Sequence, residues 1–288
     1  MFRRVCGQVF DGKGTGMNAK LVLMALIGVV GVSMVLGGCC NCGDSNGEGV
    51  AGRKGTIENW AVLQGRVERG EVDVNATDKD GLTLMHKAAR AGRIDILEWL
   101  KERGGDVNAS MNGITPMHIA AIHGRIDVMA WLWEQGADVN AESDAGSTPM
   151  HSAVMAGRLD VMQWLKEHGA EVKGKFAGNH IGGTLMHDAA LGGHVDILAW
   201  MQEQGLDVNV RNEVGFTPMH STAVNGQIAA MAWLKDQGAD INAQTHRRAT
   251  PLDITMEYDR KKAEMGGIVA KKNTNAKAAK WLRANGAQ

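Results

Sequence analysis

Histidine is the residue type in this chain of 288 residues whose spacing first suggests chemistry. Five of the ten histidines advance by 32, 33, 36 and 33 residues: His86, His118, His151, His187 and His220. A zinc ion needs ligand nitrogens about 2.1 Å away, whereas helices packed side by side lie about 8–10 Å apart. Stacked units would hold these rings too far apart to share an ion. We therefore predict a structural column in which each ring bonds nearby backbone, and no metal site.

The remaining histidines do not form a catalytic constellation in the sequence. No nucleophile with a base and an orienting group accompanies His123, His168, His180, His194 or His246. The glycine-containing segment 12–16 is too short for a phosphate-binding loop and lacks its lysine-serine ending. We predict no catalytic residue, no cofactor and no enzyme.

The cysteines all precede residue 43, next to an apolar run. Residues 21–36 follow Lys20 and are interrupted only by Ser33, which makes a run shorter than the roughly 20 residues of a spanning helix. This order is typical of a secretory signal. Leu36-Gly37-Gly38-Cys39 resembles the lipobox of bacterial lipoproteins. That resemblance implies that Cys39 is lipidated and becomes the first residue of the mature chain.

We accordingly predict a signal or anchor segment at residues 1–38 and a flexible linker, rich in Gly, Ser and Asn, at 39–55. Three alternatives stay open. The leader is an uncleaved anchor helix, the Cys39-Cys40-x-Cys42 cluster binds a metal or forms disulfides, or translation starts at Met17.

The histidine column belongs to a segment, Gly-x-Thr-Pro-Met-His or a close variant of it, that returns six times, the last copy weakened to Arg-Ala-Thr-Pro-Leu-Asp. Their threonines are Thr83, Thr115, Thr148, Thr184, Thr217 and Thr250. Tryptophan, glycine and Asp-Val-Asn columns keep the same steps: Trp99, Trp131, Trp164, Trp200 and Trp233; Gly104, Gly136, Gly169, Gly205 and Gly238. A period near 33 residues indicates a repeat architecture. The single 36-residue step places the extra residues between Gly169 and Thr184.

Each unit is predicted to contain two short helices. Thr115 caps the first helix and Pro116 occupies its first position, where a missing N–H costs nothing. In the second, residues 127–134, apolar side chains recur with helical spacing on one face. Gly136 ends it in the left-handed conformation. One such unit cannot bury its apolar face, so neighbouring units must stack.

These motifs resemble the ankyrin-repeat family, whose Thr-Pro-Leu-His-x-Ala pattern appears here with Met for Leu, over roughly residues 56–288. The resemblance implies an all-α solenoid of about six helix-turn-helix units with short β-turn tips, after a disordered or helical leader. We expect a half-repeat cap at 56–76 and repeats from about 77, 109, 141, 174 and 210. A C-terminal cap at 243–288 would carry a basic insertion near 257–272, either a longer helix or a loop.

The resemblance further implies protein binding through a concave surface of turn tips and first helices. The candidate contact residues at the tips are Lys79, Asp80, Leu82, Asn112, Ile114, Asp144, Ser147, Glu213, Val214 and Phe216. Those on the first helices are Arg90, Ile122, His123, Met155, Val224 and Asn225. We expect Leu82, Ile114 and Phe216 to be exposed, either as interface anchors or as isolated surface residues.

Trp133 is a further candidate, because other units carry Lys101, Lys166, Gln202 and Lys235 at its position. It is expected on the convex side, either as a contact with a partner or membrane or lying flat on its own helix.

Charge is distributed unevenly along the chain. Residues 56–245 contain 15 Lys and Arg against 25 Asp and Glu, a net of −10, and residues 246–288 contain 10 against 4, a net of +6. The acidic body argues against nucleic acid. The basic end meets an acidic partner, faces anionic lipid or is simply solvated.

We therefore predict a monomeric array that binds an unidentified protein. It would be tethered to the cell envelope through the N-terminal lipid or anchor and would face the periplasm or the surface. The alternative is a secreted or host-directed effector.

Overall fold

The computed structural model describes residues 60–172, 183–256 and 274–288. The chain divides into two compact units, residues 1–47 and 48–288, and all described residues belong to the second. The predicted signal segment, Cys39, the linker and the basic insertion near 257–272 lie outside the described residues. Their assignments, like the proposed unit boundaries, stay predictions.

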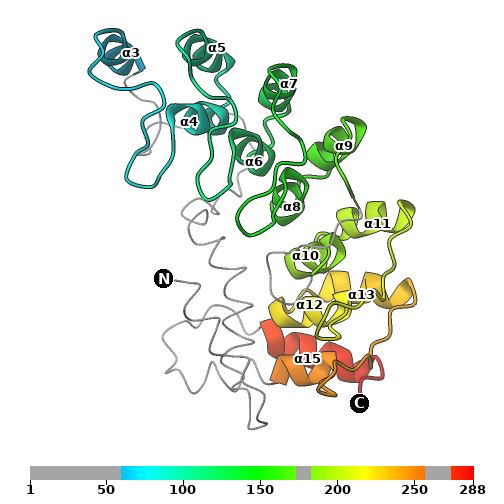
Figure 1. Cartoon of the computed structure of the whole chain (residues 1–288). Helices are drawn as coiled ribbons and strands as arrows, with labels where there is room; N and C mark the ends of the chain where they lie inside the picture. The colour runs from blue at the N-terminus through cyan, green and yellow to red at the C-terminus, as the bar shows by residue number, and fades with distance from the viewer. Residues whose placement is uncertain (1–59, 173–182, 257–273) are drawn as a thin grey trace, which may run out of the picture. The chain divides into compact units, whose positions relative to one another are not determined.

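Helices in this unit form two rows, an inner and an outer one (Figure 1). The inner helices are α4 (Leu84–Ala91), α6 (Pro116–Ile122), α8 (Pro149–Met155), α10 (Leu185–Gly192) and α12 (Pro218–Asn225). The outer helices are α3 (Trp60–Glu68), α5 (Ile94–Glu102), α7 (Ile126–Glu134), α9 (Leu159–Glu167), α11 (Val195–Glu203) and α13 (Ile228–Asp236). Each inner helix packs against its own outer helix, and α4, α6, α8 and α10 each pack against the inner helix of the next unit. The predicted all-helical solenoid is confirmed.

Local sequence explains where these helices begin and end. Thr115 is extended, with φ −104° and ψ 168°, and Pro116 follows at the start of α6. At the other end of each unit a glycine takes the left-handed conformation, as at Gly136 with φ +88°. Both features match the prediction, because proline and glycine impose their backbone preferences wherever the fold places them.

The core lies between the two rows and continues through the stack. Met117, Ala120 and Ala121 of α6 and Val128 and Leu132 of α7 are all buried. The alanines allow the inner helices to approach closely, while the methionines of the repeated motif fill the space between the rows. Each unit thus covers the apolar face of the next.

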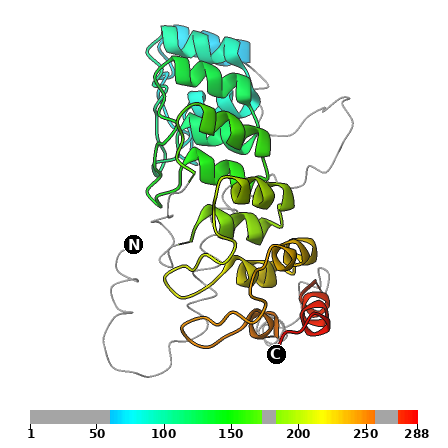
Figure 2. The same cartoon turned by 90° about the vertical axis from the view of Figure 1, so that its right-hand side faces the viewer.

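The two ends of the described array are closed by helices of different length. In α3, Leu63 and Val67 pack on the core, and the ring of Trp60 meets that of Trp99 edge-on at 5.1 Å. Residues 251–256 are helical, and α15 (Thr274–Ala284) packs beside α12 and α13 (Figure 2). Asn275 of α15 is buried and donates a hydrogen bond to the Val224 carbonyl.

Candidate functional site

The repeated threonine and histidine form a capping pair that also joins neighbouring units. The Thr115 backbone N–H donates to His118 Nδ1 at 3.2 Å, and His118 Nε2 lies 2.9 Å from the Ser147 carbonyl oxygen of the next unit. A carbonyl only accepts, so the proton must reside on Nε2. The same link joins His86 to Ile114, His187 to Phe216 and His220 to Ala249.

Burial keeps these rings neutral. It lowers the pKa of His118, His151 and His220 to about 4, and lowers the pKa of His86 and His187 as well. In His118 the proton is on Nε2 and the Nδ1 lone pair accepts the Thr115 N–H, so no lone pair is available to a metal. Within the ranges that the structure describes, no group of three potential ligands is placed to hold an ion. The histidines belong to the frame of the array.

The sixth unit carries Asp253 in place of the histidine. Its carboxylate accepts the Thr250 N–H and hydroxyl, each at 2.8 Å. The cap at the start of the helix is therefore kept. An ionised carboxylate has no donor comparable to the Nε2–H of histidine. Asp253 therefore keeps the cap but cannot donate to the carbonyl of a following unit.

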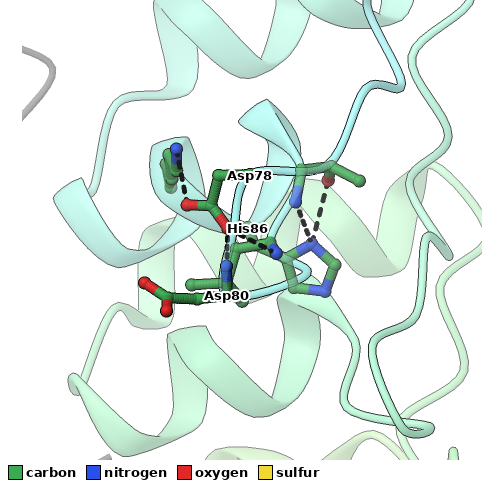
Figure 3. Close-up of polar contacts among 6 residues, drawn as sticks. Asp78, Asp80 and His86 are labelled. Atoms are coloured by element: carbon green, nitrogen blue, oxygen red, sulfur yellow. Dashed lines mark hydrogen bonds and ion pairs between the residues drawn. The ribbon is translucent and has the colours of Figure 1, made fainter.

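Four of the described turn tips are each held by a polar side chain that accepts N–H groups from its own turn. Asp78 Oδ1 accepts from Asp80 at 2.9 Å and from Leu82 at 3.0 Å, and its other oxygen pairs with Lys87 at 2.8 Å (Figure 3). Partial burial works against ionisation of Asp78, but the Lys87 contact and the two N–H donors outweigh it and lower the pKa of the carboxyl. Ser143, Asn212 and Thr245 serve as the acceptors in other tips.

Neighbouring tips also bond to one another. The Asp144 N–H donates to the Asn112 carbonyl at 2.9 Å, and the His246 N–H donates to the Val214 carbonyl at 3.1 Å. A Cβ at Gly113 would lie 2.5 Å from the Cα of Ser143, so glycine is needed for this close approach. The tips are thus pre-formed along one edge of the array.

Exposure separates the predicted contact residues into three groups. Exposed residues are Lys79, Asp80, Arg90, Asn112, Asp144, Met155, Glu213 and Asn225. Half-buried residues are Leu82, Ile114, Ile122, His123, Ser147 and Val214. Phe216 and Val224 are buried, with 6% and 7% of their surface exposed.

The expected exposure of Phe216 is therefore wrong. Its N–H donates to Asn212 at 2.9 Å, its carbonyl faces His187 and its ring lies 5.0 Å from that of His220. These contacts lie within its own unit and with His187 of the preceding unit. Val224 is likewise corrected, because α12 packs against α15, whose Asn275 bonds the Val224 carbonyl.

Trp133 is exposed to 46%, as predicted, and its partner explains its presence. On the outer row, one unit reaches the next through Lys101 and Gln135, Lys166 and Gln204, and Lys235 and Asn285. At the equivalent step the Trp133 ring meets the His168 ring edge-on at 4.8 Å. His168 in turn stacks on Trp164 at 3.8 Å. Trp133 thus takes the place of the lysine in a contact between units.

A second set of links, missed by the sequence reasoning, uses the asparagine of Asp-Val-Asn. Asn75 Nδ2 donates to the Gly104 carbonyl at 2.9 Å, and its Oδ1 accepts the Asp106 N–H at 2.9 Å. Asn140, Asn209 and Asn242 make the same pair of bonds. The sequence did carry a signal for these links, because the asparagine recurs with the period of the units. A loop residue that recurs in this way indicates a contact between units.

Comparison with known proteins agrees with this geometry. The model "Ankyrin repeats (3 copies)" matches residues 57–143, 108–175 and 174–245. The ankyrin repeat domain of human ASB11 superposes with a TM-score of 0.57 at 22% identity, covering 77% of this chain and 92% of that one. The matched residues span more than half of the sequence, so this chain belongs to the ankyrin-repeat family.

Two curated relatives match over shorter stretches. Alpha-latrocrustotoxin-Lt1a of Latrodectus tredecimguttatus is 36% identical over 53 residues, which is 18% of this chain and 4% of the toxin. Ankyrin repeat domain-containing protein OPG015 of Monkeypox virus is 48% identical over 40 residues, 14% of this chain and 9% of the viral protein. The chain thus matches a small part of either relative. The ankyrin repeats indicate a protein-protein interaction module, built on a fold typical of non-enzymatic scaffolds.

Proposed function

We propose that this chain is a membrane-tethered, non-enzymatic scaffold or adaptor that binds a partner protein through its turn tips and inner helices. The observation that carries the proposal is that, in each unit, the residues that hold the array together differ from those exposed at the turn tips. Threonine, histidine, glycine and asparagine bond the units together, whereas the exposed tip residues differ from unit to unit.

The tips are suited to binding because their backbone is ordered before a partner arrives. Asp78, Ser143, Asn212 and Thr245 each hold a tip from within, and bonds between tips add to this order. A surface that is already ordered loses little conformational entropy on association. Asp80, Asp144 and Glu213 then present charge that a complementary partner can select.

Tethering rests on the leader alone. Leu36-Gly37-Gly38-Cys39 supports lipidation at Cys39, and residues 39–55 would serve as the spacer between lipid and array. None of the helices that the structure describes is long and apolar enough to cross a membrane. The proposed location is the cell envelope, with the array facing the periplasm or the surface.

The same leader supports a second candidate, a secreted or host-directed effector that uses the same surface on a foreign protein. Fractionation of the producing cells separates the two candidates. Tethering predicts that the wild-type chain is in the membrane fraction and that Cys39→Ser moves it to the soluble fraction. Wild-type chain released into the medium supports the effector.

The binding surface is tested by capture from the native organism with the full chain. The variant Asp80→Ala, Asp144→Ala, Glu213→Ala should lose the captured partner while keeping the wild-type circular dichroism and Tm. The control is Glu98→Ala, which removes an exposed carboxylate from the outer helix α5 and should keep the partner. Equal capture by the tip variant and wild type would place the interface elsewhere.

A further inference from the structure

Three cationic side chains gather around His123 on an otherwise acidic array. Arg90 lies near the end of α4, Arg125 precedes α7 and Arg158 precedes α9, and all three are exposed. His123 follows α6 and is half-buried. We call these four residues the basic row. Residues 56–245 carry a net charge of −10, from 15 basic and 25 acidic residues, so composition alone does not explain this concentration of positive charge.

Two arginines of the basic row, Arg125 and Arg158, pack against the backbone of the preceding unit. Arg125 Nε lies 3.4 Å from the Arg90 carbonyl oxygen. A Cβ at Gly92 would meet Arg125 Cδ at 3.2 Å, and one at Gly124 would meet Arg158 Cζ at 3.3 Å. Because Gly92 and Gly124 have no side chain, Arg125 and Arg158 can pack directly against the backbone of the preceding unit. The two side chains therefore occupy equivalent places on successive units.

Arg93 shows how an arginine at the same position behaves when its charge is neutralised. It precedes α5 as Arg125 precedes α7, and it donates to Asp95 from Nε at 2.7 Å. Asp127 and Asp160 stand at the position of Asp95 in the next two units. Among the residues that the structure describes, neither forms an ion pair with Arg125 or Arg158. Arg125 and Arg158 are thus exposed, and these two aspartates do not neutralise their positive charges.

His123 does not add a fourth positive charge at neutral pH. Burial, and then the positive charges of Arg90, Arg125 and Arg158, lower its pKa to about 4. His123 thus lies within the electrostatic field of the three arginines and adds no charge of its own to the row. In the following units His194 and Gln227 stand at the position of Arg158. The row of arginines therefore ends there and has a defined length.

The spacing of the row indicates which anion fits. Equivalent groups on adjacent units are separated by about 8–10 Å, the distance between packed helices. A polyproline II segment advances about 3.1 Å per residue with three residues per turn, so side chains three residues apart lie on one face and match the step of one unit. Guanidinium groups bind carboxylates with two parallel hydrogen bonds. A single phosphate would instead need the arginines to converge on one point.

We infer that the basic row binds an extended acidic segment of the partner protein, with Arg125 and Arg158 each pairing with one of two carboxylates spaced three residues apart. This inference rests on the proposed function, because it names the chemistry of the partner that the array would bind. It assigns the segment to the end of the inner helices, beside the concave surface rather than at the tips.

The test uses the full chain and a fluorescein-labelled peptide with Glu at every third position, separated by Ser and Thr. Fluorescence anisotropy at low ionic strength measures its Kd. Arg125→Gln with Arg158→Gln should weaken binding by about tenfold or more, since two charge-assisted pairs are lost. Arg93→Gln is the matched control and should change Kd by less than about twofold. A peptide with Gln in place of Glu should not bind.

Several outcomes would overturn the inference. These are equal binding by the double variant, equal binding of the Gln peptide, or the same loss in Arg93→Gln, which would indicate only general charge attraction. Competition by inorganic phosphate at lower concentration than by free glutamate would indicate a single-anion site instead. If the double variant does not fold by circular dichroism, Arg158→Gln alone is compared with Arg93→Gln. Capture of the native partner that survives the double variant but fails with the tip variant would reject this inference and leave the proposed function standing.

Discussion

Trp133 at the end of α7 and His168 after α9 meet edge-on, with ring centroids 4.8 Å apart, at the step where other units join a lysine to an amide side chain. Both members of the pair differ from their counterparts. The aromatic contact therefore replaces the hydrogen bond as a unit, which accounts for an exposed tryptophan without a partner protein.

Exchange of this pair should show coupling between its members. We expect Trp133→Lys and His168→Gln each to lower the free energy of unfolding by about 0.5–1.5 kcal/mol, the range for aromatic pairs. The double variant restores the lysine–glutamine contact found elsewhere and should recover part of the loss. Urea unfolding of all four proteins in a double-mutant cycle measures this coupling. Strict additivity would mean that the two rings contribute independently.

Stability should fall as the pH drops from about 6.5 to about 4. Burial holds the pKa of His118, His151 and His220 near 4, below the unfolded value of 6.5. The unfolded chain therefore binds more protons in this window, and each histidine contributes stability above it that is lost as the pH falls. The free energy of unfolding lost across this window is at most on the order of 3 kcal/mol for each ring.

Urea midpoints measured from pH 7.5 to 4 test this pH dependence. Replacing His118 by Gln removes one titrating ring and should flatten the curve between pH 6.5 and 4. An unchanged midpoint of the wild-type chain across that window would contradict the neutral, backbone-bonded rings.

His118→Asp should separate the two roles of the repeated histidine. Asp253 shows that a carboxylate still accepts the threonine N–H and hydroxyl, but the link from His118 to the Ser147 carbonyl would be lost. We expect destabilisation of about 1–3 kcal/mol, because the change removes a buried hydrogen bond and desolvates a charge. His118→Ala, which loses the cap as well, should cost more in the same denaturation assay. Equal stability of His118→Asp and wild type would assign no energy to the link.

Substitution by alanine should destabilise the protein by different amounts at two glycines that have a left-handed backbone. Gly113 has φ +75° and a Cβ there would press on Ser143, whereas a Cβ at Gly136, with φ +88°, would meet nothing within 4 Å. Gly136→Ala should therefore cost only the backbone strain, about 1–2 kcal/mol. Gly113→Ala must also separate two tips and should cost more. Thermal unfolding compares them, and a smaller loss at Gly113 would contradict the close approach of the tips.

The sequence by itself determined the repeating helix pair, its stacking and the family, because these depend on preferences that act locally and recur. Thr115 with Pro116 starts a helix and Gly136 ends one in any environment, and an apolar face repeated every 33 residues has to be covered by its neighbour. The prediction that the histidine column is structural followed from the same period.

Only the tertiary structure decided which side chains each unit covers on the next. Phe216 looked like an exposed anchor, but the contacts of Asn212, His187 and His220 bury it. The partner of Trp133 is 35 positions away, and Arg125 and Arg158 acquire their spacing from glycines of the preceding units. The 33-residue period indicates that neighbouring units are in contact. Which side chains meet depends on the orientation and spacing of the two units in space.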